Sequence, residues 1–142
     1  TGDLDIFCEL KRLYGDKWLE HRDNILSLVK NEKIDIKKFY EEEMMIDELY
    51  EEVKDNFSGL YHYRWCLKDK YLEQITKSTV DYVFNEIKIN RGTRKRYQYL
   101  AKYILELRKL GNDYNIVIDI YGKIVDKYPT RKVLIEEMQK IL

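Results

Sequence analysis

Apolar residues recur at every third or fourth position along most of this chain. The clearest run of this kind comprises Val117, Ile120, Tyr121, Ile124, Val125 and Tyr128. Two further runs comprise Tyr97, Leu100, Ala101, Ile104 and Leu107, and Ile46, Leu49, Tyr50, Val53 and Phe57. This period places the apolar residues on one face of an α-helix and leaves Lys, Glu and Asp on the other. Because the alternation typical of a strand is nowhere sustained, the pattern predicts an all-α fold.

Turn-forming and capping residues divide the pattern into about nine short helices. The expected ranges are 3–14, 17–31, 34–43, 46–56, 59–69, 71–89, 94–110, 114–127 and 130–142. Three residues are expected to cap helix N-termini: Ser58, Thr93 and Asp113. Gly111 is suited to follow a helix end, and Pro129 stops the helix before it. Since short connections make neighbouring helices antiparallel, we expect helix hairpins, stacked as a short TPR-like α-solenoid or packed as a compact helical array.

The composition is typical of a helical domain with a highly charged surface. Hydrophobic residues make up 44% of the chain and charged residues 37%, whereas charged residues are about a quarter of an average protein. The 142 residues suit one domain, which we expect to span residues 1–142. The chain begins at Thr1 and not at Met, so we interpret it as a fragment of a longer protein. It contains no run of about 18 apolar residues, so we expect no membrane partner. The two cysteines, which we expect to be reduced, favour a cytoplasmic location.

The charges are unevenly distributed although their formal sum is zero. Residues 1–60 contain 16 acidic and 9 basic side chains, and residues 61–142 contain 10 acidic and 17 basic side chains. An acidic half beside a basic half can pair internally or present two faces to two partners. We favour internal or solvated complementarity.

Residues that could carry catalysis or hold a metal are sparse. His21 and His62 have no second His or Cys three or four positions away, so we expect surface or boundary residues. The run Glu41–Glu43 would point in three directions on a helix and cannot converge on one metal, so we interpret it as a solvated helix end. Cys8 and Cys66 have no metal-ligand spacing and are expected to be reduced and buried. Phosphate-loop and nucleophile motifs are also missing, so we expect no enzyme and no metal or cofactor in this chain.

The densest group of possible contact residues lies between Lys88 and Lys102. Its members are Lys88, Arg91, Arg94, Lys95, Arg96, Tyr99 and Lys102. Clustered bases attract phosphates and tyrosines can stack on bases, so the stretch could contact nucleic acid or a partner. Positive charge at a helix start opposes the helix dipole, which indicates that acids from elsewhere neutralise it. We therefore favour structural salt bridges over nucleic-acid binding. Tyr97 shares an apolar face with Leu100 and is expected to point inward.

Two motifs resemble the C-terminal helical region of bacterial SWIM zinc-finger proteins. The first consists of Arg94, Lys95, Tyr97 and Ala101, with the alanine displaced by one position from the family pattern. The closing motif consists of Tyr128, Pro129, Arg131, Leu134, Glu137 and Met138. Upstream, "FYEEEMMIDELYEEVK" resembles the acidic hairpin of the family, with Met44 in place of the glycine at its turn.

The resemblance implies a helical-repeat region attached to a finger that is thought to bind DNA or proteins. Such a finger requires a Cys-x-Cys pair and a Cys-x-His pair, which this chain lacks, so no zinc ligand carries over. Together with the residue patterns, it suggests a non-catalytic scaffold domain that binds protein segments or its own adjoining finger. The alternative is a nucleic-acid-binding helical domain that uses the stretch from Lys88 to Lys102. We read the corner of Tyr128, Pro129 and Arg131 as structural.

Overall fold

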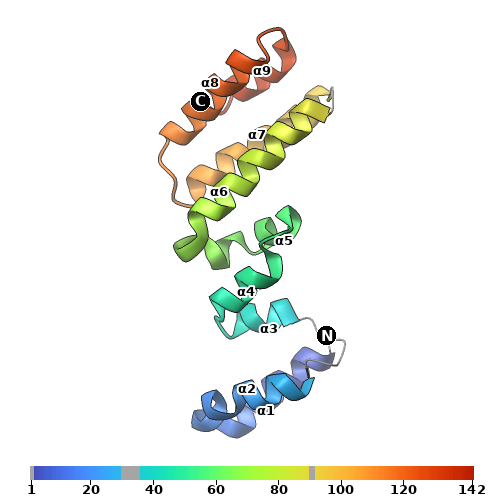
Figure 1. Cartoon of the computed structure of the whole chain (residues 1–142), viewed down its shortest axis with the longest axis vertical. Helices are drawn as coiled ribbons and strands as arrows, with labels where there is room; N and C mark the ends of the chain where they lie inside the picture. Colours follow the sequence, from blue (N-terminus) through green and yellow to red (C-terminus); the bar gives the residue numbers. More distant parts are fainter. Residues whose placement is uncertain (1, 30–35, 90–91) are drawn as a thin grey trace. The chain divides into compact units, whose positions relative to one another are not determined.

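The computed structural model describes residues 2–29, 36–89 and 92–142, and these contain helices and no strand. The all-α prediction is therefore confirmed. The helices are α1 (Gly2–Tyr14), the 3-10 helix η1 (Gly15–Lys17), α2 (Trp18–Val29), α3 (Ile36–Glu42), α4 (Ile46–Val53), α5 (Phe57–His62), α6 (Arg64–Ile89), α7 (Arg94–Lys109), α8 (Asn115–Lys127) and α9 (Lys132–Gln139) (Figure 1). Within the described ranges, no helix has the length and apolar character needed to cross a membrane.

The chain divides into two compact units, Thr1–Glu52 and Val53–Leu142. In the first unit, α1 packs on α2, and the Phe7 and Phe39 ring centroids lie 4.5 Å apart. Glu43 accepts hydrogen bonds from the Trp18 indole and, at 3.0 Å, from the Lys11 ammonium group. A solvated helix end was expected for the acidic run, but the Glu43 side chain is only 8% exposed. This carboxylate therefore joins the end of α3 to the first two helices.

The turn after α3 is a helix C-cap that has a methionine where glycine is favoured. The Met45 N–H donates to the carbonyl of Tyr40, and the Met44 N–H donates to that of Glu41. Gly111, after α7, has the same pattern, since Asn112 and Gly111 donate to Leu107 and Arg108. Both turns are Schellman motifs, whose central residue must adopt a positive φ. Gly111 has a φ of +124° and Met44 a φ of +54°, so only Gly111 adopts it without a Cβ penalty.

We expect Met44→Gly to stabilise the first unit. The methionine side chain is 69% exposed, so its removal costs little burial, while relief of the left-handed conformation should contribute about 0.5–1 kcal/mol. Thermal unfolding followed by circular dichroism measures this gain. Met45→Gly, at the next position, is the matched control and should be destabilising; a loss of stability in Met44→Gly would contradict the assignment.

In the second unit, α6 and α7 run side by side in opposite directions, and α8 and α9 pack on α7 (Figure 1). Their apolar faces form one buried cluster: Val83, Ile87, Tyr97, Leu100, Ala101, Ile104, Leu107, Val117, Ile120, Ile124, Leu134 and Met138. The cluster combines the runs predicted at 97–107 and 117–128. Ile120 and Ile124 of α8 are buried with Leu100 and Ile104 of α7.

The observed helix caps and breaks agree only in part with the predicted boundaries. Asn56, and not Ser58, caps α5 by accepting from the Gly59 N–H. The break expected near residue 70 is a kink at Tyr71 inside α6. Thr93 caps α7 as predicted, with its Oγ1 3.4 Å from the Arg96 nitrogen. Asp113 accepts from the Asn115 N–H at 3.3 Å, so it satisfies one donor of α8 from just before the helix.

Aromatic rings fill the layer between α5, α6 and α7. Phe57 stacks on Tyr82 at a centroid distance of 4.2 Å, and Tyr103 meets both rings edge-on. Tyr61 adds a fourth ring, with the Arg64 guanidinium 4.0 Å above it. Burial raises the pKa of Tyr61 and of Tyr82, so both hydroxyls stay protonated at neutral pH. These tyrosines act as packing residues with polar ends.

The cysteines are not both buried as the sequence suggested. Cys8 is exposed and Cys66 is partly buried, and both are free thiols. Cys8 lies near the start of the chain on a helix whose buried contact is made by its neighbour Phe7. An apolar neighbourhood in sequence therefore did not place the cysteine on the inner face.

Candidate functional site

The first arginine of the basic stretch is held by α9. The Arg94 guanidinium donates to Glu137 at 2.6 Å and to Glu136 at 2.8 Å. Hydrogen bonds to these two carboxylates raise the pKa of Arg94. Glu137 is 2% exposed and also accepts from Lys140 at 2.7 Å. The start of α7 is thus joined to the second turn of α9.

The second arginine is held by α6. Arg96 donates to the carboxylate of Glu86, and this hydrogen bond raises the pKa of Arg96. Salt bridging, which we favoured from the sequence, is therefore observed for Arg94 and Arg96. The acidic partners come from α6 and α9 of the same unit, and sequence reasoning did not identify them.

The other members of the stretch that the structure describes face solvent. Lys88, Lys95, Tyr99 and Lys102 are exposed, and the Lys102 ammonium lies 5.5 Å from the centre of the Tyr99 ring. Among the described residues, neither Lys88 nor Lys95 makes an ion pair. Arg91 lies outside the described residues. In the described part of the stretch, the arginines are therefore paired with carboxylates and the lysines are exposed to solvent.

The Glu137 carboxylate makes stability depend on acid pH. Hydrogen bonds from Lys140 and Arg94 lower the pKa of Glu137. A carboxyl whose folded pKa lies below its unfolded value stabilises the protein above the unfolded value, near 4.3 for glutamate. This contribution is lost as pH falls from there through the folded pKa, because the unfolded chain then binds the extra proton.

We expect Lys140→Gln to reduce this acid sensitivity. The variant loses the largest cause of the lowered pKa, so the pKa of Glu137 should rise toward its ordinary value. The difference in Tm between the two proteins should therefore be largest at neutral pH and shrink below about pH 4. Thermal unfolding between pH 3 and 7 measures it, with Lys123→Gln, on an exposed position of α8, as the control. A constant difference across this range would argue against the mechanism.

Arg131 holds the corner between α8 and α9. Its guanidinium donates to the backbone carbonyl of Ile87, near the end of α6, and lies 4.5 Å from the centre of the Tyr128 ring. The last carbonyls of a helix lack partners within the helix, so this contact satisfies one of them. Sequence reasoning assigned the corner to Pro129 and the tyrosine ring, and missed this link to α6.

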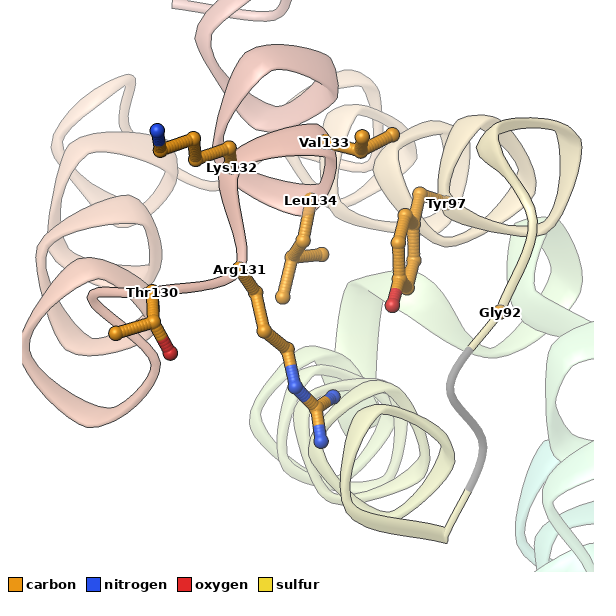
Figure 2. A pocket seen from close by; sticks show the side chains of 7 residues that line it. All are labelled: Gly92, Tyr97, Thr130, Arg131, Lys132, Val133 and Leu134. Carbon is orange, nitrogen blue, oxygen red and sulfur yellow. The ribbon is translucent and has the colours of Figure 1, made fainter.

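A groove of about 520 Å³ lies beside this corner. It is lined by Gly92, Tyr97, Thr130, Arg131, Lys132, Val133 and Leu134 (Figure 2). Gly92 forms one edge: a Cβ there would lie 3.3 Å from the Tyr97 ring and 3.0 Å from the Arg96 side chain. The absence of a side chain at this position lets the Tyr97 ring lie beside the turn.

The first turn of α9 lines this groove and contains backbone N–H groups that have no hydrogen-bond acceptor within the described chain. Its N-cap residue, Arg131, makes no side-chain capping bond, and the first turn contains no acidic residue. The Lys132 N–H donates to the Thr130 carbonyl and that of Ile135 to Arg131. The N–H groups of Val133 and Leu134 have no such acceptor within the described chain. Thr130, expected to open this helix, supplies its carbonyl and no side-chain cap.

Tyr97 extends its hydroxyl into the same groove. The residue is 6% exposed, which confirms the inward orientation expected from the sequence. Figure 2 shows the hydroxyl reaching the space beside Leu134 and Arg131. Among the described residues, the Tyr97 hydroxyl has no hydrogen-bond partner. A tyrosine instead of a phenylalanine on a buried face is the signal that could have identified it from sequence.

The described side chains include no group of three His, Cys, Asp or Glu residues that could hold a metal ion. Comparison with protein-family models, curated proteins and solved structures finds no match to this chain. The groove and the charged surface are therefore the features of the molecule that bear on its function.

Proposed function

We propose that this chain is a non-catalytic interaction domain that binds a peptide segment in the groove between the starts of α7 and α9. The segment belongs to another protein or to the remainder of its own polypeptide. The single observation behind this proposal is the groove itself, which combines an apolar wall with unpaired polar groups. Pockets of about 300–1,000 Å³ with few convergent polar groups are typical of ligand sites.

The wider setting follows the sequence resemblance. The chain serves as the helical scaffold of a cytoplasmic SWIM zinc-finger-like protein, with its hairpins arranged as a TPR-like α-solenoid. The two motifs that carry the resemblance support this setting, because Arg94 of the first pairs with Glu137 of the second. Residues of both motifs also line the groove, namely Tyr97, Arg131 and Leu134.

Selection of a peptide-display library on the purified chain tests the proposal. Val133 is 38% exposed and lines the groove, so Val133→Trp should fill it and weaken the selected peptides at least about tenfold. Ile118→Trp adds the same bulk to an exposed position of α8 that is 45% accessible, and should leave binding unchanged. Failure to select any peptide, or equal loss in both variants, would refute the proposal.

Nucleic acid is the second candidate ligand, and the exposed Lys88, Lys95, Lys102 and Tyr99 favour it. Because Arg94 and Arg96 already bind carboxylates, few cations remain to contact phosphates. We expect dissociation constants no tighter than about 10 µM at physiological salt, near the non-specific range. Fluorescence anisotropy with labelled single-stranded and duplex DNA measures this. Sub-micromolar binding that Lys88→Glu and Lys95→Glu together abolish would favour the second function.

A further inference from the structure

We propose that the groove binds the carboxylate of an acidic peptide segment, an inference that rests on the proposed function and names its ligand chemistry. Three donors belong to residues that line the groove: the N–H groups of Val133 and Leu134, which have no backbone acceptor in the described chain, and the hydroxyl of Tyr97. A ligand that covered these donors without accepting hydrogen bonds from them would bind at a cost. A carboxylate has two oxygens that can accept from all three.

The charge around the groove favours an anion. Helix N-termini carry partial positive charge and favour acidic groups in the first turn, but the first turn of α9 contains none. The described residues that line the groove include no carboxylate, so no negative side chain among them repels an anion. The acids of the second turn, Glu136 and Glu137, are already paired with Arg94. A ligand carboxylate would therefore occupy the place of the missing acidic capping residue.

The walls favour a peptide carboxylate over a phosphate. Strong phosphate sites use free guanidinium or ammonium groups, but the Arg131 guanidinium donates to Ile87 and lies over Tyr128. The Lys132 ammonium points away from Tyr97 in Figure 2. The remaining surface is formed by Leu134, Val133 and the Tyr97 ring, so an apolar residue next to the acid would be buried with it.

The test is fluorescence anisotropy of the full chain with a labelled, end-blocked peptide that alternates leucine with glutamate. Its glutamine counterpart keeps the shape and removes the charge, and should bind at least about tenfold more weakly, since charge-assisted hydrogen bonds are lost. Tyr97→Phe keeps the buried ring and removes the hydroxyl, so it should weaken the glutamate peptide about three- to tenfold. Tyr99→Phe, on the same helix but 50% exposed, is the matched control and should change nothing.

Three results would overturn the inference. They are equal binding of the two peptides, equal effects of Tyr97→Phe and Tyr99→Phe, and no binding of the glutamate peptide up to 1 mM. A single-stranded oligonucleotide that competes for the groove at lower concentration than the peptide would assign it to phosphate instead. If display selects peptides without acidic residues, this inference fails while the interaction function stands. If display selects none, both fail.

Discussion

Ile124→Ala should lower the free energy of unfolding by about 2–4 kcal/mol. Ile124 is completely buried in the cluster that joins α6, α7, α8 and α9. Its truncation removes apolar contacts and leaves a cavity, and surrounding helices can close such a cavity only in part. Because Ile104 and Leu134 from other helices belong to the same cluster, the loss affects the packing of the whole second unit. Chemical denaturation followed at 222 nm measures it.

Ile118→Ala supplies the matched control for this substitution. The same side chain is removed from the same helix, but from a position that is 45% exposed. Surface changes of this kind are usually within about 0.5 kcal/mol. If the two variants lose similar stability, or if Ile124→Ala loses less than about 0.5 kcal/mol, the inner face of α8 has been assigned wrongly.

Reversing Arg94 and Arg96 together to glutamate should destabilise the protein strongly. The new carboxylates would lie beside Glu136, Glu137 and Glu86, which now accept hydrogen bonds from the arginines. The nearly buried Glu137 would keep only Lys140 as a partner. The helix dipole alone predicts the opposite sign, since acidic residues in the first turn of α7 are favourable. A lowered Tm therefore reports the ion pairs directly.

Reversal of Lys88 and Lys95 to glutamate is the control, because it produces the same change in net charge. The dipole effects there oppose each other, because Lys88 lies in the last turn of α6 and Lys95 in the first turn of α7. We expect a change within about 0.5 kcal/mol, and a fall in Tm several times larger for the arginine pair. Equal falls for both pairs would mean that net charge, and not pairing, controls stability.

The helices and their inner faces could be predicted because they depend on local periodicity. The helical period alone places Tyr97, Leu100 and Ile104 on one face, however the helices pack. All three residues are buried. Caps were less predictable, since Asn56 and Ser58 are both suitable residues and the backbone geometry selects one. The family resemblance stays a prediction.

The groove could not be predicted because it depends on contacts between distant segments. Arg94 and Glu137 are 43 positions apart, and Arg131 and Ile87 are 44 apart. The position of the arginines at a helix start indicated that they need acidic partners, but many acids along the chain satisfy that requirement. Only packing of α9 on α7 decides that Glu136 and Glu137 are used, and only then does the first turn of α9 lie beside Tyr97.

The link from Arg131 to the end of α6 has a consequence for how a ligand would bind. The corner that forms one wall is fixed to α6, while the opposite wall is fixed through Arg94 to α9. Both walls are thus ordered before a ligand arrives, so association would not have to include the entropy loss of arranging a loop. Arg131→Met should then make the entropy of binding more unfavourable, as measured by isothermal titration calorimetry.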